Sequence, residues 1–329
     1  MIKRILIIQT ASIGDVILAT PLIEKLYAFY PESKIDILIK KGYESLFANH
    51  PFLHQVLTWD KKTSKYKNLF RLLRHIRAQH YDVVVNLQRF ASTGFLTAAS
   101  RAKQKIGFDK NPLSCFFTTK VKHLINDKKR HEIDRNLSLI VSITDNTRVK
   151  PKLYPDFATF EKTAIYKQKK YICVAPASLW FTKQFPETKW IDFLKAIPDT
   201  LNVYLLGSKE DIALCERIGT LSAHSKVENL AGKLSLLESA ALMRDAKMNF
   251  VNDSSPMHLC SSLNAPTTAI FCSTVVDFGF GPLSDDAVVV ETDEKLNCRP
   301  CGLHGFKSCP KKHFCCAESI SIDKLVQRL

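Results

Sequence analysis

The sequence lacks any apolar run near the roughly 20 residues that a membrane-spanning helix requires, although 46% of its 329 residues are hydrophobic. It also lacks a secretory signal pattern, because Lys3 and Arg4 precede only a brief apolar stretch with no small-residue cleavage site. These absences argue against an integral membrane protein and against a secreted one. We therefore expect a cytoplasmic protein, in which a reducing environment disfavours a disulfide framework among the ten cysteines.

Two nucleotide-binding fingerprints are absent as well. No strand-like segment is followed by GxGxxG, and neither GxxxxGKS nor GxxxxGKT occurs. The first motif wraps the pyrophosphate of a dinucleotide, and the second wraps the phosphates of a nucleoside triphosphate. Their absence argues against a dehydrogenase and against a P-loop enzyme.

Acidic residues are scarce in the first half of the chain. Residues 1–150 hold 26 Lys and Arg against 12 Asp and Glu, which is a net charge of +14, whereas residues 151–329 hold 21 against 20. Residues 61–80 contain seven basic residues and no acid. This asymmetry predicts that the first half meets an anionic partner, which is a nucleic acid, a membrane surface or an acidic substrate.

The basic segment 61–80 has the pattern of an amphipathic helix. Its apolar residues recur at helical spacing and are Leu69, Leu72, Leu73 and Ile76. Arg71, Arg74 and Arg77 then lie on other faces, where they form either a solvated surface or a binding surface. Only Tyr66 and Phe70 are aromatic there, and a nucleic-acid-binding surface would interleave more aromatic residues with the charges.

The length and the repeated strand–helix alternation predict an α/β protein of two Rossmann-like βαβ domains facing each other across a cleft. We place the N-terminal domain at 1–150, a connection at 151–170 and the C-terminal domain at 171–329. The predicted strands are 5–8, 34–40, 81–87, 171–175, 203–206, 248–251 and 267–271. One predicted helix begins at Asp15. The others lie within 61–80, 128–142, 186–197, 210–220, 236–245 and 256–263.

The first strand leads into a polar turn that carries the most prominent candidate residue. Ser12, Gly14 and Asp15 follow the strand, and ligands of parallel α/β sheets bind beyond the carboxyl ends of strands. Asp15 is then either a functional carboxylate or only an acidic residue that complements the helix dipole. Position alone favours neither role.

Two further candidate sites follow strands of the second half. Residues 252–258 read NDSSPMH, and Pro256 in a first helical turn leaves exposed N–H groups that suit an anion, to which Ser254, Ser255 and His258 can contribute. An ordinary helix cap with a satisfied histidine fits equally well. Lys183, in the loop 177–186, either reaches phosphate or is a surface lysine.

The C-terminal tail is rich in cysteine and histidine. It contains Cys298, Cys301, Cys309, Cys315 and Cys316, with His304 and His313 nearby. A CxxC pair followed by further cysteines is a zinc pattern, but the second CxxC of a zinc ribbon is missing. We favour reduced packing thiols or an adventitious disulfide, and we predict no metal.

Seven segments, in order along the chain, resemble one family, the bacterial heptosyltransferases of lipopolysaccharide core synthesis, glycosyltransferase family nine. The segments are SIGDVILATPL, YDVVVNLQ, HEIDRNL, the Lys183 loop with FPETKW, LLGSKED, NLAGKLSLLESAALMRDA and NDSSPMHL. The cysteine-rich tail is similar to that of the enzymes that add the second heptose. The resemblance implies the GT-B fold, no cofactor and no catalytic metal.

The resemblance also implies a reaction, namely inverting transfer of L-glycero-D-manno-heptose from ADP-heptose onto heptosyl-Kdo-lipid A. The enzyme would then be peripheral to the cytoplasmic face of the inner membrane. By the same resemblance, Asp15 is the general base, Lys183 contacts the donor diphosphate and Asp253 contacts the donor sugar. The remaining implied donor contacts are Ser178, Leu234, Ser254, Ser255 and His258. The sequence departs from the family at Ser255 and Cys272, where glycine is usual.

The charge pattern adds Arg71, Arg74 and Arg77 as candidate contacts for the Kdo-lipid A acceptor. Within the enzyme class, the alternatives are heptosyltransferase I and another nucleotide-sugar transferase. Outside it, they are a nucleic-acid-binding protein and a noncatalytic membrane-surface adaptor. We predict no nucleic-acid partner.

Overall fold

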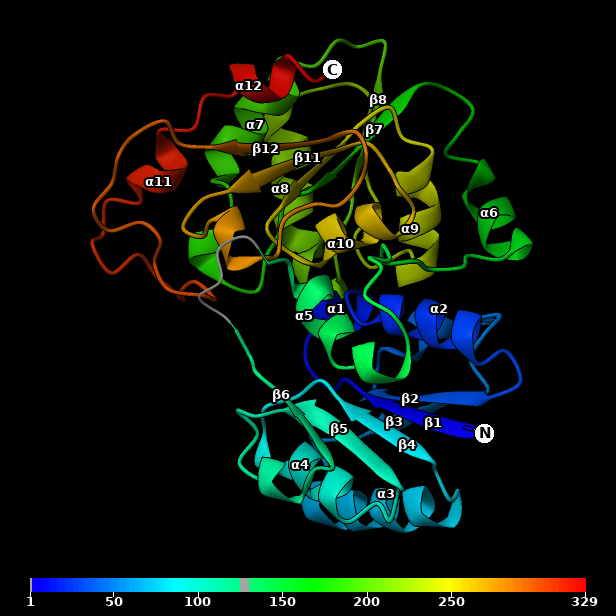
Figure 1. Ribbon diagram of the computed structural model, residues 1–329. Coiled ribbons are helices and arrows are strands. Elements are labelled where there is room, and N and C mark those ends of the chain that lie inside the picture. Colours follow the sequence, from blue (N-terminus) through cyan, green and yellow to red (C-terminus); the bar gives the residue numbers. More distant parts are fainter. Residues whose placement is uncertain (1, 125–129) are drawn as a thin grey trace. The chain divides into compact units, whose positions relative to one another are not determined.

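The computed structural model describes residues 2–124 and 130–329 of the chain. The described chain divides into two compact units, Met1–Tyr154 and Pro155–Leu329, each built on a six-stranded parallel sheet (Figure 1). This architecture confirms the predicted α/β class. Among the described helices, none has the length and apolar character needed to cross a bilayer.

Unit 1 has a sheet in the order β3-β2-β1-β4-β5-β6. Its strands are β1 (Arg4–Ile8), β2 (Lys34–Lys40), β3 (Gln55–Trp59), β4 (Val83–Asn86), β5 (Gln104–Phe108) and β6 (Thr119–Val121). Its helices are α1 (Ile13–Ile17), α2 (Thr20–Phe29), α3 (Lys65–Ala78), α4 (Ala91–Ala98) and α5 (Glu132–Ser138), with 3-10 turns at η1 (Glu44–Phe47), η2 (Ser114–Phe116) and η3 (Val141–Ile143).

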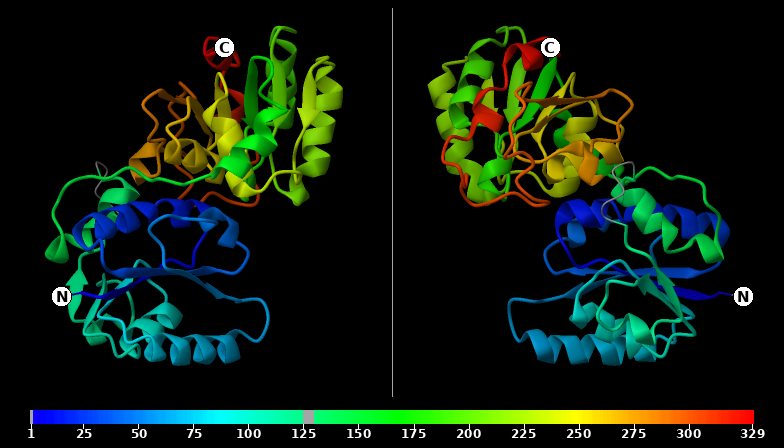
Figure 2. Two further views of the ribbon diagram at one scale, coloured as in Figure 1. Left: turned by 90° about the vertical axis from the view of Figure 1, so that its right-hand side faces the viewer. Right: turned by 60° about the vertical axis from the view of Figure 1, so that its left-hand side comes forward.

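The helices of unit 1 form a layer on each face of the sheet. Helices α1, α2 and α5 cover one face, and α3 and α4 cover the other, as both views in Figure 2 show. Leu69, Leu73 and Ile76 of α3 pack into the same core cluster as Leu6 and Val84 of the sheet. The helical spacing of those apolar residues therefore buries one side of α3 and leaves its basic side outward.

The opening strand leads into two short helices rather than one. Ser12 caps α1, and α2 begins at Thr20 with Pro21 in its first turn. Proline has no N–H to donate to the preceding turn, so it suits the start of a new helix and interrupts a continuing one. The helix predicted from 128 is α5 and begins at Glu132, while residues 128 and 129 lie outside the described residues.

Unit 2 has the sheet order β12-β11-β10-β7-β8-β9. Its strands are β7 (Tyr171–Ala175), β8 (Asn202–Leu205), β9 (Val227–Asn229), β10 (Asn249–Asn252), β11 (Thr267–Phe271) and β12 (Ala287–Glu291). Its helices are α6 (Phe157–Ala164), α7 (Glu187–Lys195), α8 (Ile212–Ser222), α9 (Leu236–Arg244), α10 (Ser255–Ser262), α11 (Cys315–Glu318) and α12 (Asp323–Val326), with 3-10 turns at η4 (Phe181–Lys183), η5 (Lys209–Asp211) and η6 (Val276–Phe278).

The two sheets have the same topology. When the six strands of each unit are counted in chain order, both sheets run 3-2-1-4-5-6. In such a sheet the strand order reverses between the first and fourth strands, and ligands bind at the carboxyl ends of these two strands. The expected binding positions therefore follow β1 and β4 in unit 1, and β7 and β10 in unit 2.

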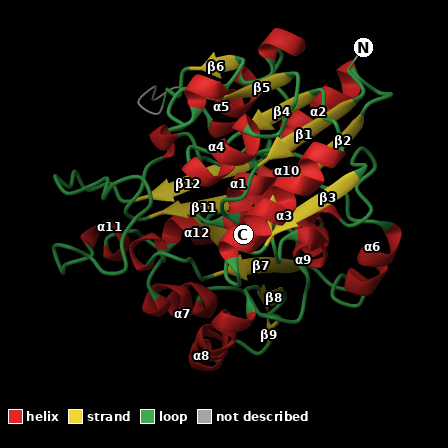
Figure 3. Cartoon of the chain, turned by 90° about the horizontal axis from the view of Figure 1, so that it is seen from below, coloured by secondary structure: helices red, strands yellow, loops and turns green. Residues whose placement is uncertain are grey.

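The tail is part of the core of unit 2. The residues 292–314 between β12 and α11 contain neither helix nor strand and run as loop in Figure 3. Phe314 at the end of this loop, and Cys316, Ile320 and Leu325 beyond it, join the core cluster that contains Trp190 and Phe250. The irregular segment 292–314 is thus anchored at both ends, by β12 and by this buried tail.

Candidate functional site

Asp15 lies after β1, at the predicted binding edge of unit 1, and caps its own helix. Its Oδ2 accepts hydrogen bonds from the Ser12 N–H (3.1 Å) and the Ser12 hydroxyl (2.6 Å). The Ser12 side chain in turn accepts the Asp15 N–H, which completes a capping box. Both of these bonds to the carboxylate reach Oδ2, so the capping box does not use Oδ1.

Basic side chains gather at the same edge of unit 1. Lys61 follows β3 and its Nζ donates to the carbonyl (2.8 Å) and hydroxyl (3.0 Å) oxygens of Thr10. Burial, together with the charges of Lys40 and Lys65, lowers the pKa of Lys61 to about 8. Arg89 follows β4 and is exposed. We did not predict either residue from sequence, although Arg89 lies two residues after the predicted strand 81–87.

A buried ion pair on α5 lies near Asp15. Arg135, which is 2% exposed, contacts Glu132 at 2.7 Å and donates to the Arg130 carbonyl at 2.7 Å. Burial raises the pKa of Glu132, Arg135 opposes this effect, and the negative charge of Asp15 adds to the rise. The pair therefore places a second carboxylate within electrostatic range of Asp15.

The structure does not bring Arg71, Arg74 and Arg77 to Asp15. All three are on α3, which covers the opposite face of the sheet from α1 (Figure 1). Arg71 and Arg74 are exposed, whereas Arg77 is half-buried and its Nε donates to the Ala99 carbonyl at 2.7 Å. Arg77 thus joins α3 to the end of α4.

In unit 2 the structure brings Lys183 and Asp253 together. Lys183 Nζ lies 2.7 Å from Asp253 Oδ2, and the Thr274 hydroxyl donates to the same oxygen at 2.6 Å. Asp253 is 5% exposed, while the Lys183 side chain is 16% exposed. The three residues come from η4, the turn after β10 and the turn after β11, so only the fold assembles them.

Asn252 joins the two loops that carry this pair. Its Oδ1 accepts the Phe185 N–H at 2.9 Å, and its Nδ2 donates to the Pro176 carbonyl at 2.7 Å. The amide is completely buried, so both bonds are strong constraints on the loop 176–185. Sequence analysis missed this role, for which a polar residue ending an apolar strand was the available signal.

The other predicted donor residues lie around this edge. Ser254 is the N-cap residue of α10 and Ser255 begins the helix. His258 is the fourth residue of the helix and is buried. Ser178 is half-buried in the Lys183 loop, where its carbonyl accepts from Gln184 Nε2 at 2.5 Å. Leu234 is half-buried and precedes Ser235, the cap of α9.

The N-terminus of α10 adds a favourable potential for an anion. The Ser254 side chain does not cap the helix and instead donates to the Asn252 carbonyl at 3.4 Å. The first N–H groups of a helix have no partners within the helix, and the dipole makes this end positive. Together with Lys183, the helix gives the edge of unit 2 two sources of positive potential beside one carboxylate.

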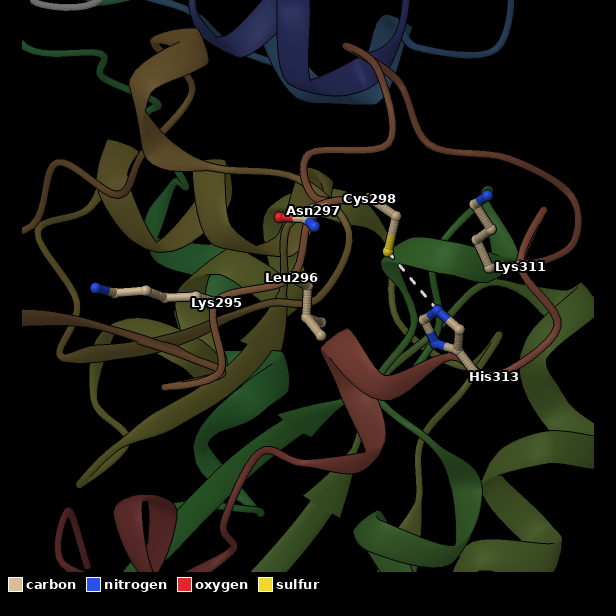
Figure 4. Close-up of a pocket in the computed structure, with 6 residues that line it drawn as sticks. All are labelled: Lys295, Leu296, Asn297, Cys298, Lys311 and His313. Carbon is tan, nitrogen blue, oxygen red and sulfur yellow. Dashed lines mark hydrogen bonds between the residues drawn. The ribbon is translucent and has the colours of Figure 1, made fainter.

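The cysteine-rich tail surrounds a separate hollow. A cavity of about 360 Å³ is lined by Lys295, Leu296, Asn297, Cys298, Lys311 and His313 (Figure 4). Cys298 Sγ lies 3.8 Å from His313 Nε2, and all ten cysteines are free thiols. Over residues 2–124 and 130–329, no three His, Cys, Asp or Glu side chains are arranged to hold a metal ion. The absence of a metal remains a prediction.

Comparison with known proteins confirms the predicted fold and resemblance. Lipopolysaccharide heptosyltransferase 3 of Escherichia coli is 26% identical over 276 residues, which cover 79% of this chain and 81% of that protein. Lipopolysaccharide heptosyltransferase 1 of Campylobacter coli is 25% identical over 295 residues, with 82% and 84% covered. The structure of E. coli ADP-heptose LPS heptosyltransferase II superposes with a TM-score of 0.81 at 19% identity, covering 99% of this chain and 97% of that one.

The structural likeness establishes the two-domain GT-B fold. A structure of the glycosyltransferase family 9 protein of Veillonella parvula has a TM-score of 0.82 at 20% identity, with 99% and 95% covered. The model of glycosyltransferase family 9 (heptosyltransferase) matches residues 69–305, which is more than half of the chain. This chain therefore belongs to glycosyltransferase family 9, the heptosyltransferase family.

Proposed function

We propose that this glycosyltransferase moves L-glycero-D-manno-heptose from ADP-heptose onto heptosyl-Kdo-lipid A with inversion, at the cytoplasmic face of the inner membrane. The observation that carries the proposal is the group of Lys183, Asp253 and Thr274 beside the N-terminus of α10. The diphosphate of a nucleotide sugar can bind to Lys183 and the helix N-terminus, and the sugar hydroxyls can donate hydrogen bonds to the Asp253 carboxylate.

In the proposed reaction, unit 2 binds the donor and stabilises the leaving group. As the bond between the sugar C1 and the diphosphate oxygen breaks, ADP gains negative charge. Lys183 and the α10 N-terminus would stabilise that charge, and this requires no metal. Asp253 would accept a hydrogen bond from a heptose hydroxyl, while Ser178, Leu234, Ser255 and His258 would line the nucleotide and diphosphate.

Unit 1 would bind the acceptor and supply the base. The acceptor hydroxyl attacks C1 from the side opposite ADP, and its proton passes to Asp15. The acceptor has phosphates and carboxylates, which suit a unit with 27 Lys and Arg against 12 Asp and Glu. Lys61 and Arg89 are our candidates for direct contact because they share the binding edge with Asp15. Arg71 and Arg74 would act at longer range.

The test measures heptose transfer to Kdo-lipid A with and without a first heptose, using wild type, Asp15→Asn and Asp211→Asn. Asp211 accepts from Ser208 N–H (2.8 Å) and Oγ (2.7 Å), so it is a matched capping-box control. We expect Asp15→Asn to lower kcat about 10³-fold with ADP affinity retained, because a general base is typically worth about 10²- to 10⁴-fold. We expect little change for Asp211→Asn and a preference for the heptosylated acceptor.

Equal, small effects of the two substitutions would show that Asp15 is only a cap. Preference for Kdo-lipid A without heptose would identify the first transfer instead. Activity only with a different nucleotide sugar would keep the reaction class and replace the donor. Absence of transfer by the wild type to either acceptor, alongside tight duplex binding at moderate salt, would favour a nucleic-acid-binding protein.

A further inference from the structure

The irregular segment 292–314 is hydrogen-bonded to the turn that carries Lys183. Thr182, which is 1% exposed, donates its N–H to the Phe306 carbonyl at 3.1 Å. The Phe306 N–H donates back to Thr182 Oγ1 at 2.8 Å. Thr182 also contacts Ser273 twice, through the two hydroxyls (3.0 Å) and from the Ser273 N–H to its carbonyl (3.2 Å). One buried threonine therefore joins three segments that are distant in sequence.

Gly305 allows the close approach of these segments. Its φ is +75°, a conformation that favours glycine. A Cβ at this position would lie 2.9 Å from Thr182 Oγ1 and 3.0 Å from Lys183 Cγ. The irregular segment thus lies directly against the side chain of Lys183 as well as against its neighbour.

Arg299 fixes the backbone on the other side of the pair. Its Nε donates to the Cys272 carbonyl at 2.7 Å, and its Nη2 donates to the Thr274 carbonyl at 2.8 Å. Glu291 holds the guanidinium at 2.5 Å, and the arginine side chain is 11% exposed. The Cys301 N–H adds a bond to the Ser273 carbonyl at 2.8 Å. Residues 272–274 are therefore held from the irregular segment at successive carbonyls.

We propose that Thr182 and Arg299 are positioning residues that hold Lys183 and Thr274 around Asp253, so that the irregular segment forms part of the diphosphate-binding site. The proposal rests on the proposed function of Lys183. A lysine side chain loses conformational entropy when it is ordered. A prearranged turn supplies part of this ordering before the ligand binds, and preorganised charge is what stabilises a diphosphate.

The proposal predicts an effect specific to the β-phosphate of the nucleotide. We would measure dissociation constants for ADP and AMP by titration calorimetry and compare their ratio, because only ADP offers the second phosphate. Thr182→Val removes the hydroxyl at nearly constant volume, and Thr182→Ser retains it. We expect Thr182→Val and Arg299→Gln to lower the preference for ADP over AMP about tenfold. Thr182→Ser should keep the wild-type preference.

The control is Arg217→Gln, because Arg217 forms a comparable two-pronged bond to Glu187 (2.9 and 2.8 Å) on an exposed part of unit 2. This variant should keep the wild-type ratio. Should Thr182→Val or Arg299→Gln fail to fold, Gly305→Ala, which adds one methyl group on the irregular segment, should still lower the ratio severalfold.

A ratio within twofold of wild type in the folded variants would overturn the proposal, as would equal losses for ADP and AMP. Lys183→Met separates this failure from failure of the proposed function. If Lys183→Met leaves the ratio unchanged, Lys183 does not bind the diphosphate and the proposed function fails. If it lowers the ratio while Thr182→Val does not, only the positioning role fails.

Discussion

The two units have the same strand order and different ways of holding their candidate residues. In unit 1, Asp15 is held by Ser12, three residues away on the same turn. In unit 2, Lys183 and Asp253 are 70 positions apart, and Thr274 and Arg299 come from still later segments. One carboxylate is thus placed by a local motif and the other by tertiary contacts.

Charge differs between the units as well. Residues 1–154 hold 27 Lys and Arg against 12 Asp and Glu, whereas residues 155–329 hold 20 of each. A shared topology therefore fixes where a ligand can bind but not which ligand, because the residues after each strand vary without changing the sheet. The following predictions test this contrast.

The largest expected effect is on the stability of unit 2. Lys183→Met leaves the buried Asp253 carboxylate without its cation, and removing one partner of a buried ion pair costs about 4 kcal/mol. Asp15→Asn changes a half-buried local cap and should cost about 1 kcal/mol. Denaturant unfolding measures both. Adding Asp253→Asn to Lys183→Met should recover much of the loss, and a double variant less stable than Lys183→Met would contradict this.

Acid should lower the stability of unit 1 by slightly less than Lys183→Met lowers that of unit 2. His50 is 7% exposed and its Nδ1 accepts the Phe52 N–H at 3.2 Å, which requires an unprotonated Nδ1. Burial lowers the pKa of His50 from 6.5 to about 4. The unfolded chain then binds this proton at a higher pH than the folded chain does. Its contribution to stability is complete above pH 6.5 and is lost as the pH falls to 4, by about 3 kcal/mol.

Unfolding free energies at pH 7, 5.5 and 4 would measure this loss. His50→Gln should reduce the pH dependence of stability between pH 6.5 and 4, since glutamine does not titrate. His80→Gln is the control, because His80 is an exposed histidine of the same unit. An unchanged pH dependence in His50→Gln would assign the acid sensitivity to other groups.

Salt should weaken binding of the acceptor more than binding of the nucleotide. Raising the salt concentration from 50 to 300 mM should raise KM for the anionic acceptor about tenfold, since exposed charges are screened beyond about 10 Å. The Kd for ADP should change only about twofold, because the Lys183–Asp253 pair is largely buried. Steady-state kinetics and calorimetry over the same salt series give both numbers. Equal salt dependence would remove the distinction between the units.

The smallest effect on the acceptor KM is expected from substitutions on α3. Arg71→Gln combined with Arg74→Gln should change the acceptor KM less than twofold, because α3 lies across the sheet from α1. Lys61→Gln should raise it about tenfold, since Lys61 contacts Thr10 at the binding edge. The reverse order of effects would restore the basic face of α3 as the acceptor site.

Local chemistry made part of the fold predictable. The strands β1, β4 and β7 can be recognised in the sequence as short β-branched or apolar runs, because parallel strands are buried on both faces. The strand β3 was missed, since only two of its five residues, Leu57 and Trp59, are buried. The helix α4 was missed too, because its sequence ASTGFLTA has weak helical periodicity and no side-chain cap.

The sequence by itself determined the alternation of strands and helices, the excess of positive charge in the first 150 residues and the local cap around Asp15. These follow from periodicity, counting and contacts over three or four residues. Only the tertiary structure decided that Lys183 meets Asp253, that Arg71 and Arg74 lie across the sheet from Asp15, and that Arg299 holds the turn of Thr274. Such contacts depend on strand order and on the path of an irregular segment, which no local pattern encodes.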